Sequence, residues 1–432
     1  MTRVPAAEDQ RCAYTRSLDA LNFLLADVRG ALRPFLNVFL VTQQHWSQSS
    51  VGVVTSVGGL LGLVAQTPVG AAIDATRAKR GLIIAALCVL AAGAVVIFAW
   101  SSFWPVLIAN TLMAVVGDVF GPAVAALTLG LVARSALAPR LGRNAAFDHA
   151  GNVAIAAAAG AVGWAFSQRA VFLLVPVCTI LATAAVLTVP ASAIDHERAR
   201  GGDGYQEAAE PAAAKMALRV MADCRPLLIF GCCTVLFHLA NAPLLPLVGQ
   251  KLALAHRDFA TLMMSSCIIA AQAIMLPIAL IVGRWADRVG RKPILLIGFG
   301  VLPIRAVLYT LSNQAWWLIG VQLLDGVGAR ILGAVTPLVI ADLMRGTGRF
   351  NVAQGAVATM QGIGASSSCL IAGFIVDHAG YDPAFLAAGA IAAAAFGTLL
   401  IMMPETGNTL AAATDGSPAG WAVPTKVPAR PG

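Results

Sequence analysis

Charged residues are scarce in this chain of 432 residues: Asp, Glu, Lys and Arg make up 12% of it, whereas hydrophobic residues make up 58%. A soluble domain carries about 25% charged residues, because a surface that faces water needs polar cover. The scarcity therefore excludes an ordinary soluble protein, including a large helical one. A chain that crosses the membrane many times is the class that fits.

Motifs of nucleotide-driven chemistry, metal binding and secretion are also missing. The sequence holds no G-x-x-x-x-G-K-[ST] motif, which argues against ATP hydrolysis by the chain. Its eight cysteines form no C-x-x-C pair, and most lie in apolar runs, so we interpret them as packing residues. The first seventeen residues, MTRVPAAEDQRCAYTRS, lack the apolar core of a cleavable signal peptide. We expect no enzymatic activity, no metal and no cofactor.

Long apolar runs are what the chain does hold, and a membrane-crossing helix needs about 20 mostly apolar residues. We predict twelve spans, roughly at residues 17–41, 49–72, 81–99, 104–131, 144–166, 171–189, 226–247, 259–282, 293–311, 316–343, 352–376 and 383–403. The polar segment 190–225 divides them six and six. We therefore predict an all-α membrane protein with an N-terminal segment 1–16, a six-helix bundle 17–190, a linker 191–225, a second six-helix bundle 226–404 and a disordered tail 405–432.

The positive charges of the chain lie mostly on one side of the predicted spans. With both termini on that side, its loops hold 22 of the 29 Lys and Arg residues, and four more lie inside spans. The opposite side holds three, at Arg169, Lys251 and Arg257. Since cytoplasmic loops carry the excess of Lys and Arg, we predict cytoplasmic termini in a cell inner membrane. The net charge of +8 then needs no nucleic-acid partner.

A charged segment occurs once in each half of the chain. GAAIDATRAKR covers Gly70–Arg80, and GRWADRVGRKP covers Gly283–Pro293. Internal repeats across two six-helix halves are typical of transporters. Looser echoes are LGRNAAFDHAGN against TGRFNVAQGAV, and Pro34 against Pro243. The residues that match 213 positions apart are Gly70 and Gly283, Asp74 and Asp287, and Lys79 and Lys292.

The second segment resembles the loop motif of the major facilitator superfamily, G-x-x-x-D-[RK]-x-G-[RK]-[RK]. The resemblance extends over about residues 17–405 in span count, linker and loop polarity. It implies two pseudo-symmetric six-helix bundles around a central cavity, with alternating access. The matching residues are Gly283, Asp287, Arg288, Gly290, Arg291 and Lys292, and those of the weaker first copy are Gly70, Asp74, Lys79 and Arg80.

Two interpretations of the motif compete. In the first, the aspartate pairs with the arginines of the loop and with a helix N-terminus, and these contacts form and break as a gate. In the second, the cations only mark the cytoplasmic side. Topology requires Lys and Arg alone, whereas a spaced Gly and Asp recur here, so we favour the gate.

Ionisable side chains inside spans are costly and are functional candidates by default. Arg29 and Arg33 are four residues apart and share a helical face. They suit an anionic substrate group, with Asp27 carrying a coupling proton; equally, Asp27 suits a static pair with an arginine of a neighbouring helix. Pro34, one turn after Gly30, predicts a kink. The further substrate or proton candidates are Asp118, His238, Asn241, Asp325, Arg330 and Gln361.

The resemblance implies a secondary active transporter of a small organic solute, working in the bilayer as a monomer. Our prediction is proton-coupled export. The alternatives are a proton-coupled importer of an anionic metabolite and a transporter-like membrane sensor or scaffold. The fifth span lacks the G-P-x-x-G-G ending of drug/proton antiporters, and the linker lacks the P-E-S-P-R pattern of sugar porters. The substrate class is therefore left open by the sequence.

Overall fold

The computed structural model of the chain describes residues 7–29, 32–76, 78–132, 134–190, 193, 195 and 210–407. Within these residues the regular secondary structure is helical. This is the arrangement that a bilayer favours, because a helix satisfies its own backbone N–H and C=O groups. Residues 408–432 of the predicted tail and residues 191, 192, 194 and 196–209 of the predicted linker lie outside the described part.

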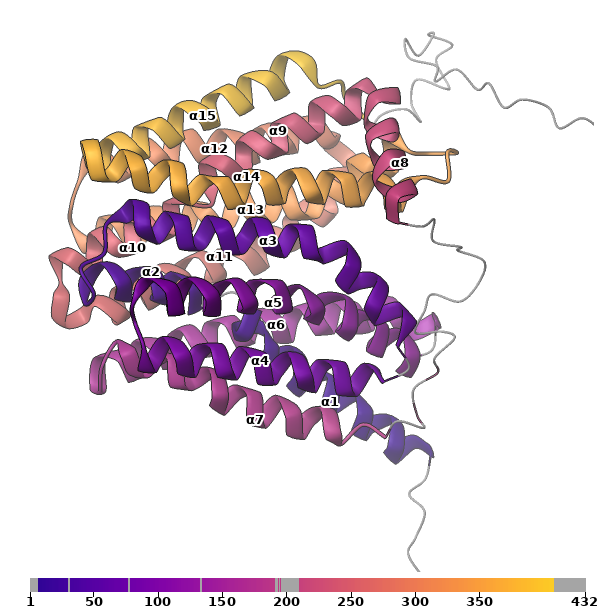
Figure 1. Cartoon of the computed structure of the whole chain (residues 1–432). Helices are drawn as coiled ribbons and strands as arrows, with labels where there is room; N and C mark the ends of the chain where they lie inside the picture. The colour runs from indigo at the N-terminus through magenta and orange to yellow at the C-terminus, as the bar shows by residue number, and fades with distance from the viewer. Residues whose placement is uncertain are drawn as a thin grey trace, which may run out of the picture.

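The helices fall into two sets, one of which lies above the other in Figure 1. The first set is α1 (Ala7–Arg29), α2 (Leu32–Thr42), α3 (Gln48–Ala75), α4 (Lys79–Ala99), α5 (Phe103–Leu131), α6 (Arg134–Ala165), η1 (Arg169–Leu173) and α7 (Leu174–Leu187). The second set is α9 (Arg225–Asn241), α10 (Leu244–Ala255), η4 (Arg257–Phe259), α11 (Ala260–Val289), α12 (Arg291–Leu311), α13 (Ala315–Leu343), α14 (Phe350–Ala379) and α15 (Tyr381–Met402). Between them, α8 (Glu210–Asp223) lies within the predicted linker.

Twelve helical segments of membrane-crossing length make up the described fold. Ten of them are apolar enough to span a bilayer by length and composition alone. The other two are α1–α2, of which Leu32–Thr42 alone is a shorter apolar helix, and α6, whose first half carries charged residues. The predicted fifth span, which starts near residue 144, lies in a helix that starts earlier. Helix α6 begins at Arg134, so the predicted loop before it is helical.

Corresponding helices of the two halves are related by a constant shift along the chain. Five helix starts lie 212 residues apart: Leu32 and Leu244, Gln48 and Ala260, Lys79 and Arg291, Phe103 and Ala315, and Arg169 and Tyr381. This register differs by one residue from the motif offset. It pairs Pro34 with Pro246, so the expected pairing of Pro34 with Pro243 is wrong by about one helical turn.

The first and seventh segments are each described as two helices. Helix α9 ends at Asn241 and α10 begins at Leu244. The prolines at positions 243 and 246 account for this, because proline cannot donate the backbone hydrogen bond that continues a helix. In the first half, α1 ends at Arg29 and α2 begins at Leu32, and Gly30 of the predicted kink lies outside the described residues.

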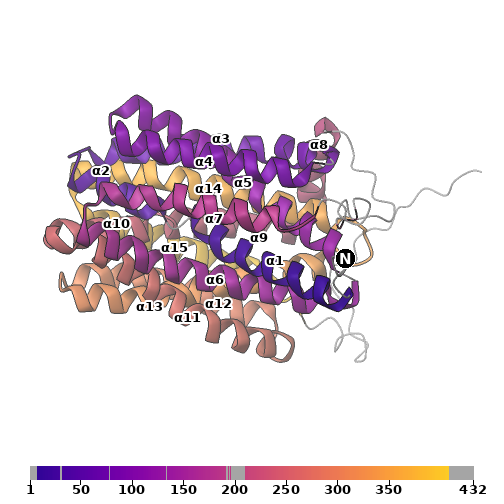
Figure 2. The same cartoon turned by 90° about the horizontal axis from the view of Figure 1, so that it is seen from below.

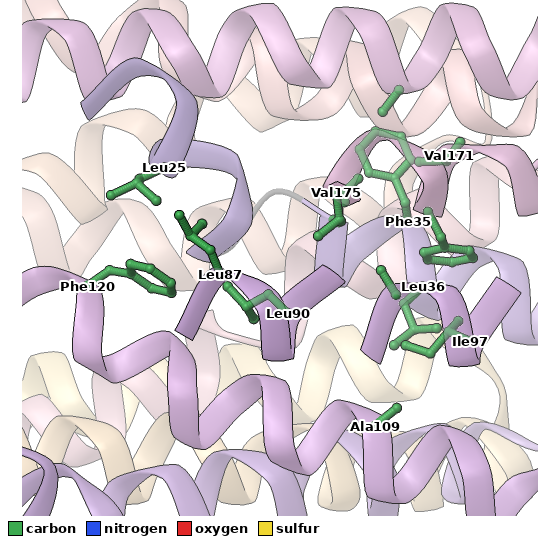
Figure 3. Packing of buried hydrophobic residues seen from close by; sticks show 14 of the residues in the cluster. Leu25, Phe35, Leu36, Leu87, Leu90, Ile97, Ala109, Phe120, Val171 and Val175 are labelled. Carbon is green, nitrogen blue, oxygen red and sulfur yellow. The ribbon is translucent and has the colours of Figure 1, made fainter. Parts of the chain in front are cut away.

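Each bundle is held by its own apolar core. In the first bundle, Leu87 and Leu90 of α4 lie near Leu25 of α1 and Phe120 of α5, and Leu36 of α2 lies near Ile97 of α4 (Figure 3). A corresponding cluster fills the second bundle. Because the lipid tails outside are as apolar as these side chains, close packing rather than the hydrophobic effect holds such helices together.

The two bundles touch mainly at one end of the molecule. We call this end the distal side; it carries the turn between α2 and α3 and the turn between α14 and α15. We call the opposite end, with α8 and the two charged segments, the motif side (Figures 1 and 2). On the distal side the N-terminal part of α3 lies against α14, and the C-terminal part of α6 against α11.

Glycines and small hydroxyl residues bring these helices into backbone contact. A Cβ atom on Gly52 of α3 would lie 2.6 Å from the carbonyl oxygen of Cys369 on α14. Between α6 and α11, Ser265 Oγ donates to the carbonyl oxygen of Ala156 at 2.6 Å. Small residues allow this close approach, so the distal side of the space between the bundles is closed.

A carboxylate adds a polar contact to the distal closure. Asp377, near the end of α14, accepts hydrogen bonds from the backbone N–H groups of Gln48 at 2.9 Å and Ser49 at 2.7 Å. These N–H groups begin α3 and have no partner within their own helix. The second bundle therefore caps a helix of the first.

We predict that Gly52→Ala destabilises the protein by about 1 to 3 kcal/mol, because the added methyl group must separate α3 from α14. Gly320→Ala is the control, since a Cβ there would meet nothing within 4 Å, and both changes raise helix propensity alike. The measurement is thermal unfolding of the purified protein in detergent. Equal melting temperatures for the two variants would contradict the close contact.

Candidate functional site

The second charged segment joins α11 to α12 through a single residue. Gly283 and Asp287 lie in the last two turns of α11, and Gly290, with φ of 97°, is the break before α12. The expectation of a loop is therefore wrong: the motif is helix, glycine, helix. The positive φ favours glycine. The Arg288 side chain is exposed, and that of Asp287 lies outside the described side chains.

Glu405 caps the start of α12 and was not anticipated by the sequence, which placed it in the tail. Its carboxylate accepts the backbone N–H of Arg291 at 2.7 Å and that of Lys292 at 3.1 Å. A Cβ on Gly290 would lie 2.7 Å from this carboxylate. Arg291 Nε in turn donates to Asp342 Oδ2 at 3.2 Å. The motif thus ties the ends of α11, α13 and α15 around the N-terminus of α12.

The first charged segment is built differently. Gly70 and Asp74 lie in the last turns of α3, and Lys79 and Arg80 begin α4. Lys79 is buried, and Arg80 Nη2 donates to the carbonyl oxygen of Leu187 at 3.3 Å. The side chains of Gly70 and Asp74 are outside the described set. Whether either copy works as a gate stays a prediction.

In both halves, the arginine of the weaker repeat (LGRNAAFDHAGN and TGRFNVAQGAV) lies close to an aspartate. Arg143 Nη2 of α6 lies 2.7 Å from Asp19 Oδ2 of α1, and Arg140 Nη2 lies 2.6 Å from Asp19 Oδ1. In the second half, Arg349 Nη1 lies 3.8 Å from Asp223 Oδ2 at the end of α8. Both pairs lie on the motif side and connect the start of a bundle to its fifth helix.

Three of the predicted residues line one pocket in the second bundle. The pocket has a volume of about 270 Å³, and His238, Asn241 and Gln361 contribute to its wall. His238 Nδ1 donates to the carbonyl oxygen of Thr234 at 2.9 Å, which leaves the other ring nitrogen for a ligand. The remaining lining residues include Phe237, Thr336 and Gln354. The pocket therefore offers amide, hydroxyl and imidazole groups beside an aromatic ring.

Arg33 and Asp118, on two helices of the first bundle, lie within electrostatic range of each other. Arg33 of α2 lies within electrostatic range of Asp118 of α5 and of Cys369 of α14. Asp118 packs against α3, where a Cβ on Gly62 would lie 3.1 Å from its Oδ2 atom. Arg33 therefore lies between the bundles. Asp27 and Arg29 belong to α1, and their side chains are outside the described set.

Asp325 and Arg330 point to different partners, although both lie on α13. Asp325 forms a buried ion pair with Arg305 of α12, and Gln322 Nε2 donates to Asp325 Oδ2 at 3.0 Å. Arg330 Nη1 instead faces His149 of α6 at 3.5 Å. The structure thus places Asp325 inside the second bundle and Arg330 at the contact between bundles. Arg305 is one of the four cations that lie inside the predicted spans, but its pairing with Asp325, 20 residues away on another helix, could not be predicted from the sequence.

These features define a polytopic membrane protein of two pseudo-symmetric helical bundles, with polar groups gathered between and beside them. The model of the Major Facilitator Superfamily matches residues 18–278 and 227–431. The chain belongs to this family, and its fold is the twelve-helix fold of the family, as the sequence predicts.

Curated relatives from two strains of Mycobacterium tuberculosis, CDC 1551 / Oshkosh and ATCC 25618 / H37Rv, are each 48% identical over 391 residues. The alignments cover 90% of this chain and 93% of each relative, and both relatives are described as uncharacterized MFS-type transporters. The chain is therefore similar to membrane transporters over nearly all of its length.

Solved structures of the nucleoside transporter NupG share the fold. A point mutant of NupG superposes with a TM-score of 0.77 over 90% of this chain and 100% of that chain, at 13% identity. NupG itself gives a TM-score of 0.70 over 90% of this chain and 98% of that chain, at 12% identity. At such identity the likeness concerns the fold alone.

We predict that Asp325→Asn destabilises the protein by about 3 to 5 kcal/mol, because it leaves the buried Arg305 without its counter-charge. Asp382→Asn is the matched control: its pair with Lys251 is half exposed, and such pairs contribute about 1 kcal/mol or less. Unfolding of both variants in detergent measures the difference. A loss for Asp325→Asn no larger than for Asp382→Asn would refute a structural role.

We predict that Glu405→Gln speeds hydrogen exchange of the first turn of α12, since a neutral amide accepts the N–H groups of Arg291 and Lys292 more weakly than a carboxylate. The change corresponds to about 0.5 to 2 kcal/mol of capping free energy. Mass spectrometry of exchanged peptides measures it, with the first turn of α13 as an internal reference. Unchanged protection at α12 would exclude the cap.

Proposed function

We propose that the protein is a proton-coupled secondary transporter that exports a small organic solute by alternating access. The observation that carries the proposal is the polar pocket of the second bundle, with His238, Asn241 and Gln361 in its wall, in a protein that also carries Arg33 and Asp118 inside spans and whose bundles meet on the distal side. Alternating access requires such a central site and two bundles that rock around it.

Charge distribution supports the orientation in the membrane. The motif side holds most of the Lys and Arg residues, and the positive-inside rule then places it, with both termini, in the cytoplasm. The distal closure would accordingly face the outside of the inner membrane. In this arrangement we expect a solute to reach the pocket from the cytoplasm, as an exporter requires.

Asp118 is the residue that we propose for proton coupling in the first bundle. It lies inside a predicted span, within electrostatic range of Arg33 on another helix. Protonation of Asp118 would leave Arg33 without its counter-charge and so favour a different arrangement of the two helices.

The pocket favours a solute with hydrogen-bonding groups. Its wall combines Asn241, Gln354 and Gln361 with the ring of Phe237, and these suit a compact molecule with an apolar face and polar edges. All the residues that line the pocket belong to one chain, so a monomer would suffice to bind the solute.

Import of an anionic metabolite is the second candidate, and a specific observation favours it. Arg33 and Arg330 both lie near the space between the bundles, where a carboxylate or phosphate would meet them. A sensor or scaffold would need neither the pocket nor the repeated charged segment, so we place it third.

Reconstitution tests the proposed function. Purified protein in liposomes with an imposed pH gradient should move protons when a substrate is added, and a deletion strain should become sensitive to a compound if the direction is export. Failure to grow on a compound would instead favour import. No proton movement across a broad panel of solutes would overturn proton-coupled transport.

We predict that Asp118→Asn abolishes accumulation driven by the pH gradient but preserves exchange of labelled for unlabelled solute, because exchange needs no net proton transfer. Asp382→Asn on the distal side is the control and should behave as wild type. Both are measured in the same liposomes. Full gradient-driven accumulation by Asp118→Asn would exclude Asp118 as the coupling residue.

We predict that Asp287→Asn reduces transport to a small fraction of wild type while the protein still inserts in the membrane. The lost carboxylate would weaken the charge pairs of the motif on the motif side. Arg288→Lys keeps the charge and is the control. Transport rates and the amount of membrane-inserted protein are measured together, and wild-type rates for Asp287→Asn would refute the gate.

A further inference from the structure

The imidazole ring of His149 contacts two side chains of the opposite bundle, one at each ring nitrogen. It lies on α6 of the first bundle, and its partners are Gln272 of α11 and Arg330 of α13 in the second. The Nδ1 atom lies 2.9 Å from Gln272 Oε1, and Arg330 Nη1 lies 3.5 Å from Nε2. We call this contact the His149 junction. It is half-buried, and it links three helices that must move when the bundles rock.

The partners of the ring fix where its proton lies. An amide oxygen such as Gln272 Oε1 only accepts a hydrogen bond, so Nδ1 carries the hydrogen and donates it. A guanidinium only donates, so Nε2 presents its lone pair to Arg330. The contact therefore requires a neutral imidazole in one tautomer.

We propose that Nε2 of His149 binds a second proton, beside the one proposed at Asp118, and that proton binding and the His149 junction exclude each other. A proton on Nε2 occupies the lone pair that accepts from Arg330, and it sets an imidazolium against a guanidinium. Arg330 cannot relieve this by losing its own proton. This inference rests on the proposed proton coupling and adds His149 to Asp118 as a second proton-binding group.

The other charged groups around α6 have partners elsewhere or lie at its ends. Arg330 is the charged group that the described side chains place in contact with the ring. Asp148, next to His149, has interactions of its own, and the side chains of Asp27 and Arg29 on α1 are outside the described set. The remaining charged groups on packed elements are Asp19 of α1, bound by Arg140 and Arg143; Arg33 of α2 with Asp118 of α5; Asp325 of α13 with Arg305; Arg169 of η1 at the distal end; and Arg288 of α11 at the motif end.

Coupling follows from this exclusion. In the arrangement described here Arg330 occupies Nε2, so the proton is absent; once the bundles shift and Arg330 leaves, Nε2 is free to take it. A proton that binds one arrangement and not the other shifts the equilibrium between them. Imidazole suits this role because it exchanges protons near neutral pH.

The test follows the separation of the bundles as pH changes and needs no substrate. Labels attached to genetically encoded residues at Ala146 of α6 and Trp285 of α11, both exposed on the motif side, report the distance between these helices in the full chain in lipid nanodiscs. We expect the wild-type distance distribution to shift between pH 8 and pH 5.5. His149→Gln, which keeps hydrogen bonding but takes no proton in this range, should lose the shift.

Matched variants separate charge from packing. Arg330→Gln should lose the shift, because a protonated ring no longer meets a cation, whereas Arg330→Lys should keep it. His378→Gln, on the distal side of α14, should respond as wild type. A wild-type pH response in His149→Gln or Arg330→Gln would overturn the proposal.

Measuring proton transport in liposomes separates a failure of the proposed His149 site from a failure of the proposed transport function. In one outcome, His149→Gln and Arg330→Gln lose the pH-dependent change in distance, and no solute added to the wild-type liposomes causes proton movement. This outcome would support the site and overturn the transport proposal. Proton-coupled flux at the wild-type rate in His149→Gln would overturn the site and support transport.

Discussion

The constraint on which this structure depends is the absence of water in the bilayer core. Every backbone N–H and C=O group there needs a partner inside the protein, so the chain folds into helices. Helix ends are the places where this requirement fails locally. The structure satisfies several of them with carboxylates from distant segments: Glu405 at the start of α12, and Asp377 at the start of α3.

The same constraint sorts the charged residues into two kinds. Asp325 and Arg305 are buried against each other inside one bundle, where they hold α12 to α13. Arg33, Asp118 and Arg330 instead lie on helices that face the space between or beside the bundles, and their partners belong to other helices. Charges of the second kind change their surroundings when the bundles move, which is why the proposed coupling rests on them.

The two halves of the chain repeat the same arrangement of helices but not the same charged side chains. The shift of 212 residues between helix starts repeats the framework, yet the helix ends in the two charged segments differ. In the second half Gly290 alone separates α11 from α12, whereas in the first half α3 ends at Ala75 and α4 begins at Lys79. Position 118 holds an aspartate and the equivalent position 330 an arginine, so a single framework carries opposite charges in its halves. The functional groups are thus asymmetric where the helices are not.

Composition and local pattern determined the class of this protein: the spans, the six-and-six division and the family motif depend on hydropathy and on residues close together in the chain. The pocket residues His238, Asn241 and Gln361 were also named from the sequence, because polar groups in a span stand out. Tertiary structure alone decided the partners. His149 meets Arg330 across 181 positions, and Asp325 pairs with Arg305 rather than with Arg330. Such pairs depend on how helices rotate and pack, and no local pattern encodes that.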